Sequence, residues 1–376
     1  MNFTHYVPTK IYFGTGISRQ ISDIIRQLPV KNIFIVTGTN IRSKTPILHG
    51  IIKQLRGYRL SIFSEVVSNP DIYQVAQCMR RIVQTKAQCV IGLGGGSVLD
   101  LAKAAALLIS NPGRPEEYFL SGKEIHHTGL PVVAIPTTAG TSSEITPFSV
   151  ITFPERKSKI TLNHNLLYPV YALVDPLLCI YAPRMVSASS GLDVLSHAFE
   201  AYWNKRSTPF TDLYAVEAIR IVFKKLVTAC KGIGKKRSHA VEQMCLAALY
   251  AGFSFSQTKT TGPHAVSYPL TTLFGIPHGL ACSLTLAEFY RFNMRALMNK
   301  NKSLMQPVNA KTPRAIARSI TRLISDVGFK TKLRDYGITK SNIPAIIRHA
   351  YLPAKFKHNP CRINRQNLRS IITNIL

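Results

Sequence analysis

The first half of the chain alternates short apolar runs with segments of helical periodicity. Runs rich in β-branched residues are typical of buried strands, and they cover residues 32–38, 60–66, 89–95 and 131–137. Between them, apolar residues recur at helical spacing, most clearly over 71–86 and 97–110. Strands that alternate with helices over short connections predict a parallel, doubly wound sheet.

The second half has a different pattern, because the strand signals stop at about residue 185. Long segments with Ser or Thr near their starts and Gly or basic residues near their ends are typical of helices, and they cover 187–203, 208–230 and 240–257. The pattern therefore predicts an α/β domain to about residue 180, followed by an all-helical domain.

A glycine-rich turn follows the third predicted strand, in the sequence CVIGLGGGSVLDLAK. Gly94, Gly95 and Gly96 let the backbone approach a phosphate, and the helix that opens at Ser97 offers free N–H groups to it. Glycines in such a turn can also serve packing alone. The pattern departs from GxGxxG, and no ribose-binding acid lies about twenty residues further on.

A second turn follows the fourth predicted strand, in AIPTTAGTSSEIT. The hydroxyl groups of Thr137, Thr138, Thr141 and Ser142 suit hydrogen bonds to a nucleotide. An ordinary Ser/Thr-rich turn is the alternative for this segment.

Four residues of the helical half suit a divalent metal. Asp193 and His197 are spaced i, i+4 and so share one helix face. An acid and an imidazole within an apolar pattern are costly to bury unpaired, although such a pair can also lie on a helix surface. His264 and His278 add two imidazoles from an apolar, Gly/Pro-punctuated stretch, and the set of one carboxylate and three imidazoles suits Fe(II) or Zn(II).

Charge and composition narrow the function classes. The 376 residues carry 47 Lys and Arg but only 18 Asp and Glu, a formal net charge of +29. The basic residues are spread along the chain, whereas a nucleic-acid-binding protein usually gathers them, so nucleic-acid binding is the disfavoured alternative. The positive potential instead favours anionic substrates and cofactors.

Cellular context follows from the cysteines and the apolar runs. Seven scattered cysteines without a CxxC motif indicate reduced thiols in a cytoplasmic protein. The chain lacks both an apolar run long enough to span a membrane and a secretory signal at its start, so we expect no membrane partner. The oligomeric state stays open, and a homo-oligomer is compatible with the sequence.

With these motifs in place, the chain resembles the iron-containing alcohol dehydrogenases. The resemblance runs nearly end to end, through PTKIYFGTG, GGGSVLDLAK, IPTTAGTSSEIT, VDPLL, GLDVLSHAFEAY and GIPHG. It implies an N-terminal Rossmann-like parallel-sheet domain over 1–182 that binds the nucleotide. It also implies an all-α C-terminal domain over 183–376 that binds metal and substrate, with the substrate between the two domains.

The resemblance assigns residue roles. The family's metal ligands fall on Asp193, His197, His264 and His278, for Fe(II) with Zn(II) as the alternative. Its cofactor contacts fall on Gly94, Gly95, Gly96, Ser97, Asp100, Thr137, Thr138 and Lys159. The cofactor that the resemblance implies is NADH or NADPH.

Two departures from the family pattern bear on these roles. Gly38 stands at the end of the first predicted strand, residues 32–38, where many members carry an acid that favours NAD. We therefore expect NADPH to be tolerated or preferred. Tyr268 stands where many members carry a further histidine, so its hydroxyl is the candidate catalytic proton donor.

The stretch KTTGPHAVSYPLT resembles the subgroup associated with phosphonate metabolism, which reduces phosphonoacetaldehyde to 2-hydroxyethylphosphonate. Lys259, Thr260 and Thr261 would then offer a cation and hydroxyl donors to the anionic end of the substrate. Alternatively, Lys259 points to solvent and the threonines cap a helix. A general alcohol or diol dehydrogenase of the same family remains the rival function, while a metal-free maleylacetate reductase would lack part of the ligand set.

Overall fold

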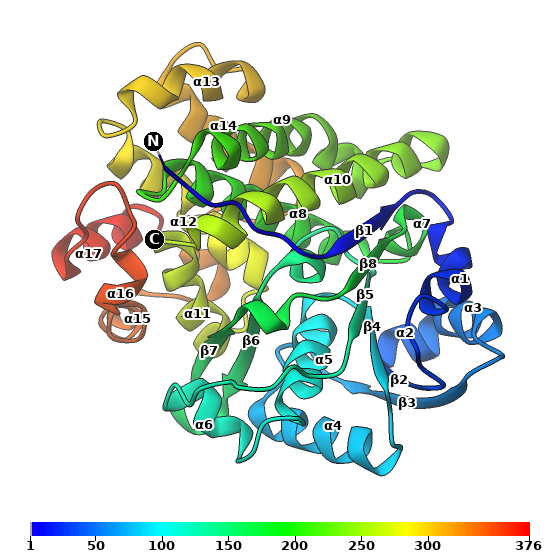
Figure 1. Cartoon of the computed structure of the whole chain (residues 1–376). Coiled ribbons are helices and arrows are strands. Elements are labelled where there is room, and N and C mark those ends of the chain that lie inside the picture. Colours follow the sequence, from blue (N-terminus) through cyan, green and yellow to red (C-terminus); the bar gives the residue numbers. More distant parts are fainter. Residues whose placement is uncertain (1) are drawn as a thin grey trace. The chain divides into compact units, whose positions relative to one another are not determined.

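The computed structural model describes residues 2–376 as two compact units (Figure 1). The sheet unit comprises Val7–Thr138 and Ser142–Ala182. The helical unit comprises Pro183–Leu376, the short segment Ala139–Thr141 and the N-terminal residues through Tyr6.

The sheet unit is built on six parallel strands. Their order across the sheet is β1-β8-β5-β4-β2-β3. The strands are β1 (Lys10–Phe13), β2 (Asn32–Gly38), β3 (Arg59–Val66), β4 (Cys89–Gly94), β5 (Val132–Pro136) and β8 (Tyr171–Val174). The doubly wound parallel sheet predicted from the sequence is confirmed.

The central strands β2, β4 and β5 are buried on both faces, which is why they are apolar at nearly every position. Along β2, Ile33 and Ile35 pack on one face, while Phe34 and Val36 pack on the other. The seven helices of the unit are α1 (Ile21–Ile25), α2 (Thr39–Lys44), α3 (Ile47–Gln54), α4 (Ile72–Gln84), α5 (Gly96–Leu108), α6 (Pro115–Leu120) and α7 (Pro176–Cys179).

An antiparallel hairpin that the sequence pattern did not predict lies beside α5. Its strands are β6 (Phe148–Phe153) and β7 (Ser158–Asn163). Alternate residues of β6 are buried, so Ile151 and Phe153 join the core that α4 and α5 form.

The carboxyl ends of three neighbouring strands bring the predicted nucleotide residues to one edge of the sheet. Thr37 of β2 pairs with Leu93 of β4, and Gly94 pairs with Pro136 of β5. The residues that follow these strands therefore share the edge where open α/β sheets bind their ligands.

The helical unit contains ten α-helices within the described chain. They are α8 (Arg184–Trp203), α9 (Pro209–Lys231), α10 (Gly234–Thr258), α11 (Gly262–Phe274), α12 (His278–Asn293), α13 (Met298–Val308), α14 (Pro313–Asp326), α15 (Ile343–Ala350), α16 (Pro353–Phe356) and α17 (Arg365–Asn374). Helix α8 packs against α9, α10 and α12, and its residues from Gly191 to Trp203 are buried. The all-helical second half is also as predicted.

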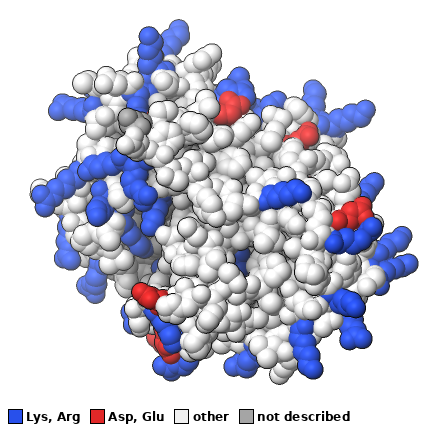
Figure 2. Space-filling model, viewed as in Figure 1, with Lys and Arg blue, Asp and Glu red and all other residues white. Residues whose placement is uncertain are grey.

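The basic excess is a surface property. Lys and Arg side chains are spread over the visible face, with few Asp and Glu between them (Figure 2). Among residues 2–376, no helix is both long and apolar enough to cross a bilayer. The described cysteines are all free thiols, and all except Cys361 are buried.

Candidate metal centre and nucleotide loop

Three helices bring the predicted metal ligands of the helical unit toward one carboxylate. Asp193 lies on α8, His264 on α11, and His278 is the first residue of α12. Oδ1 of Asp193 is 3.6 Å from Nε2 of His264 and 3.9 Å from Nε2 of His278. Two ligand atoms that are each about 2.1 Å from one ion lie at most about 4.2 Å apart, so both distances suit a shared cation.

The fourth member of the converging set is Cys282, which the sequence reasoning did not identify. One donor atom each from Asp193, His264, His278 and Cys282 lie within 4.8 Å of one another. Cys282 is one turn after His278 on α12, and its Sγ is 3.9 Å from Nε2 of that histidine. This i, i+4 spacing was the signal in the sequence that could have revealed it.

His197 lies beside this set. Its Nδ1 is 4.0 Å from Oδ2 of Asp193, and its ring stacks between Phe255 and His264, with centroids at 3.9 Å and 4.4 Å. The structure thus keeps His197 against the ligand carboxylate, and its role as a ligand remains a prediction.

Unpaired buried atoms indicate that these residues fit a cation. Oδ1 of Asp193, Nδ1 of His197 and Nε2 of His264 are buried without a hydrogen-bond partner among the described residues. Leaving such an atom unpaired costs about 1–3 kcal/mol. A divalent ion would remove this cost, and one carboxylate with imidazole nitrogens suits Fe(II) or Zn(II).

The electrostatics favour the metal-binding protonation states of Asp193 and His197. Burial by itself would raise the pKa of Asp193, but the charges of His197 and His278 outweigh it and hold this pKa well below its usual range. Burial lowers the pKa of His197 to about 3. An ionised carboxylate and a neutral imidazole are the forms that coordinate cations. At His264, in contrast, the effect of burial is outweighed by the charges of Cys282 and Glu200, which raise the pKa well above its usual value.

Glu200 supports the cluster from behind, and the sequence reasoning missed it. It is fully buried on α8, and its Oε1 contacts Nδ1 of His264. Its Oε2 accepts hydrogen bonds from the backbone N–H and the hydroxyl of Thr261. A carboxylate on the far nitrogen of a ligand histidine fixes the ring so that the other nitrogen faces the metal.

Gly279 allows α12 to approach α8 closely at this point. A Cβ at Gly279 would lie 2.0 Å from the carbonyl oxygen of Ser189 and 2.8 Å from Cβ of Asp193. Only glycine fits there, which explains the glycine of the Pro-His-Gly turn in terms of the metal cluster.

Tyr268 lies next to the cluster, one turn after His264 on α11. Its ring is nearly parallel to that of His278, with centroids 6.0 Å apart. The ammonium of Lys355, from α16, lies 3.9 Å from the centre of the Tyr268 ring. Lys355 was not singled out from the sequence, since it stands in a polar segment without a motif.

The predicted substrate residues occupy different environments. Lys259 is exposed and has φ 68° and ψ 173°, a backbone conformation that is costly for any residue except glycine. Thr260 is half-buried beside it. Thr261, in contrast, is buried, and it binds Glu200 and accepts a hydrogen bond from Nε1 of Trp203 at 2.9 Å. Thr261 therefore belongs to the support of His264.

In the sheet unit, the glycine turn joins β4 to the N-terminus of α5. A Cβ at Gly94 would lie 2.6 Å from Cγ2 of Val98, and one at Gly95 would lie 3.2 Å from Oγ1 of Thr138. The first glycine therefore allows the helix to pack on its strand, and the second keeps the turn against the Thr137–Thr138 segment. Gly96 begins α5, whose first N–H groups are available to an anion.

Asn69 connects two predicted cofactor residues and was missed from the sequence. Its N–H donates to Oγ of Ser97 at 3.1 Å, and its Oδ1 accepts from Nζ of Lys159 at 2.7 Å. Asn69 adopts a positive φ of 59° in the turn before α4, as asparagine often does. Lys159 of β7 is thereby held near the start of α5.

Asp100, also predicted as a cofactor contact, is occupied by structural bonds. It accepts hydrogen bonds from the Ser143 hydroxyl and from the Val150 N–H, the latter at 2.9 Å. These bonds join α5 to β6 and to the turn that precedes it.

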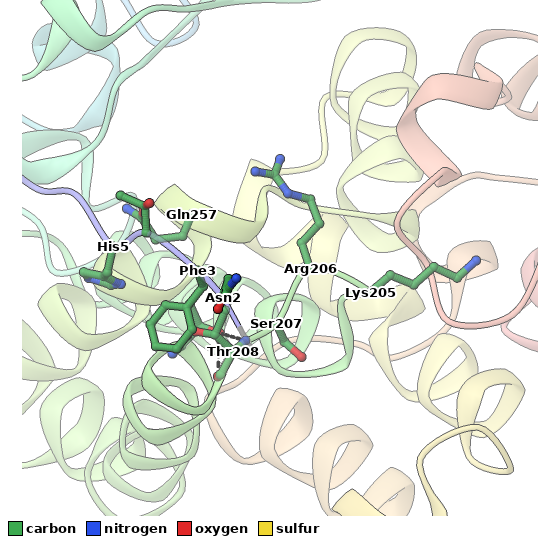
Figure 3. A pocket seen from close by; sticks show the side chains of 10 residues that line it. Asn2, Phe3, His5, Lys205, Arg206, Ser207, Thr208 and Gln257 are labelled. Carbon is green, nitrogen blue, oxygen red and sulfur yellow. Dashed lines mark hydrogen bonds between the residues drawn. The ribbon is translucent and has the colours of Figure 1, made fainter.

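A separate pocket of about 370 Å³ lies at the start of α9 (Figure 3). Lys205 and Arg206 line it, but their side chains extend away from the group formed by Asn2, Phe3 and Thr208. The pocket shares no residue with the metal cluster, and the Thr208 hydroxyl already caps α9.

Comparison with known proteins gives consistent matches along the chain. Residues 8–176 match the family model described as iron-containing alcohol dehydrogenase, and residues 187–376 match the C-terminal model of the same family. A 1,3-propanediol dehydrogenase from Klebsiella pneumoniae is 31% identical, with 98% of this chain and 97% of the relative covered. Alcohol dehydrogenase 4 from Saccharomyces cerevisiae is 29% identical, with the same shares covered.

Among solved structures, a sulfoacetaldehyde reductase from Bifidobacterium kashiwanohense in complex with NAD⁺ is 32% identical. The superposition covers 100% of this chain and 99% of that one, with a TM-score of 0.93.

Proposed function

The chain belongs to the iron-containing alcohol dehydrogenase family and is an oxidoreductase that acts on CH–OH groups with NAD, and we propose that its substrate is a small anionic aldehyde, phosphonoacetaldehyde. The product would be 2-hydroxyethylphosphonate. The observation that supports the dehydrogenase chemistry is the convergence of Asp193, His264 and His278, with buried, unpaired donor atoms on the first two.

Support for an anionic substrate comes from unpaired cations in the same unit. Lys259 and Lys355 form no ion pair with an acid among the described residues, and Lys355 reaches the ring that neighbours His278. A phosphonate needs charged donors of this kind. The similarity to a reductase of another anionic aldehyde, sulfoacetaldehyde, points the same way.

The residues of the chain have distinct proposed roles. Fe(II), or Zn(II), would be held by Asp193, His197, His264 and His278, joined by the neighbouring thiol of Cys282. The nucleotide would be held by Gly94–Ser97, Thr137, Thr138 and Lys159. When bound, the divalent ion supplies Lewis-acid polarisation of a carbonyl group and the reduced nicotinamide supplies the hydride. Glu200 fixes the His264 ring, and the Tyr268 hydroxyl delivers the proton to the alcohol oxygen of the product.

The nucleotide preference is part of the proposal. Arg42 lies in α2, the helix that follows Gly38, and it donates a hydrogen bond to Oγ of Ser64 at 2.8 Å. A cation rather than an acid therefore lies near the end of β2. We propose that NADPH is accepted at least as well as NADH, because no carboxylate at this point repels a 2′-phosphate.

A second candidate function is that of a general alcohol or diol dehydrogenase, which the similarity to 1,3-propanediol dehydrogenase favours. Rates with phosphonoacetaldehyde, sulfoacetaldehyde, 3-hydroxypropanal and propanal separate the candidates, measured with protein loaded with Fe(II) or Zn(II) and with either nicotinamide. We expect kcat/KM for phosphonoacetaldehyde to exceed that for propanal by at least about tenfold. Equal values would contradict the phosphonate assignment and leave the general function in place.

A further inference from the structure

We propose that Lys355 is the residue that binds the anionic end of the substrate. The inference rests on the proposed function and makes it specific, since it moves the main contact with the anion from Lys259 to a side chain beside the metal cluster.

Lys355 is connected to the metal cluster through one aromatic ring. Its ammonium lies 3.9 Å from the centre of the Tyr268 ring, and that ring lies 6.0 Å from the ring of His278. Helix α16, which carries Lys355, packs against α11, which carries both Tyr268 and His264. The cation therefore lies on a helix that packs against one of the three helices of the cluster.

Lys355 has no acidic partner within the described chain. The side chain is half-buried, and no carboxylate forms an ion pair with it. Burial is the cause that lowers the pKa of Lys355 to about 8, and no neighbouring acid opposes this effect. A half-buried ammonium without an acid is costly unless a ligand supplies the negative charge, although the face of Tyr268 offsets part of the cost.

The length of the substrate favours Lys355 over Lys259. Two carbon atoms separate the carbonyl oxygen of phosphonoacetaldehyde from its phosphorus, so a residue that contacts the anion must lie close to the metal ligands. Lys259 is exposed, and its pKa is lowered by partial burial and by the charge of Arg206. The charge of Lys259 interacts with that of Arg206, whereas the ammonium of Lys355 contacts the ring that stacks on His278.

Substitution tests the assignment with matched controls. We expect Lys355→Met to lower kcat/KM for phosphonoacetaldehyde by about 10- to 100-fold, mainly through KM, because a charge-assisted hydrogen bond is lost. The kcat/KM for propanal should fall by a clearly smaller factor, because propanal has no anionic group for the ammonium to bind. Lys355→Arg should retain most of the preference, and Lys357→Met, which removes an exposed lysine two residues away, should change neither rate.

Inhibition by methylphosphonate provides a second readout that needs no reactive anion. We compare the inhibition constant of methylphosphonate against propanal reduction in the two proteins. It should be at least about tenfold lower for the wild-type protein than for Lys355→Met. This comparison also detects a variant that binds metal and cofactor but has lost only the anion site.

The outcomes separate this inference from the proposed function. If the wild-type protein prefers phosphonoacetaldehyde and Lys355→Met keeps that preference, or Lys259→Met removes it instead, the role of Lys355 is wrong while the function stands. If the wild-type protein shows no preference, the phosphonate function is wrong, and the methylphosphonate experiment alone decides whether Lys355 binds anions.

Discussion

The buried carboxylate of Glu200 contacts Nδ1 of His264, on the opposite side of the ring from the nitrogen that faces Asp193. Both acids come from α8, so one helix supplies a carboxylate to each side of the same imidazole. Through Thr261 and Trp203, the contact extends to the start of α11. The orientation of a predicted ligand is therefore fixed before any metal binds.

Removal of the Glu200 charge should weaken metal binding. Glu200→Gln keeps the size of the side chain but replaces the charged acceptor of the Nδ1 hydrogen bond with a neutral amide. We expect metal affinity to fall by about 10- to 100-fold. Competition between the protein and a chelator for Zn(II) measures the change. Glu217→Gln is the control, since Glu217 pairs with Arg220 on the partly exposed face of α9; an equal loss in both variants would argue against the role of Glu200.

The thiol of Cys282 should coordinate the bound metal. Its sulfur lies within the same 4.8 Å cluster as Asp193, His264 and His278. Protein loaded with Co(II) should show a thiolate-to-metal charge-transfer band in the near ultraviolet, which Cys282→Ala loses and Cys361→Ala keeps. A spectrum of wild-type protein without this band would restrict coordination to the carboxylate and the imidazoles.

An acid at residue 38 should shift the nucleotide preference toward NADH. A Cβ at Gly38 would make ordinary contacts, 3.5 Å to the oxygen of Val66 and 3.8 Å to Cγ2 of Val98, so aspartate is sterically tolerated. We expect Gly38→Asp to lower kcat/KM for NADPH relative to NADH by at least about tenfold, because the carboxylate repels the 2′-phosphate.

Steady-state kinetics with both nucleotides provide the measurement for this substitution. Gly57→Asp adds the same charge at a position with open space and serves as the control. A ratio unchanged by Gly38→Asp would show that the nucleotide ribose lies elsewhere.

The preference for an anionic aldehyde should decline as pH rises through about 8. Burial lowers the pKa of Lys355 to about 8, so its ammonium is charged below this pH and neutral above it. Tyr268 of α11 is the titratable side chain against the ammonium, and Lys357 and His358 follow Lys355 in the chain.

Sulfoacetaldehyde is the suitable substrate for this measurement, because its sulfonate keeps one charge throughout the range. The ratio of its kcat/KM to that of propanal should fall between about pH 7 and about pH 9. Lys355→Arg should remove the decline, since a guanidinium stays charged. A ratio that is flat in the wild-type protein would contradict the role of the Lys355 charge.

Sequence patterns predicted a structural feature correctly where one continuous segment of the chain forms that feature. The buried strands of the sheet read as apolar runs because helices cover both faces of the sheet, and the glycine turn is visible because β4, the turn and α5 are consecutive. The hairpin β6–β7 was missed because its alternating burial depends on contacts with α4, α5 and α6.

By itself, the sequence determined the parallel sheet, the helical second half and the family, and it supplied the candidate residues for holding metal and nucleotide. Tertiary structure decided which side chains meet. It placed Glu200 behind His264, Cys282 among the converging donor atoms, Asn69 between Ser97 and Lys159, and Lys355 over Tyr268. The physical reason is that hydrogen bonding, coordination and cation–π contact act over a few ångströms in space, while these partners lie on separate helices and strands whose packing no local pattern records.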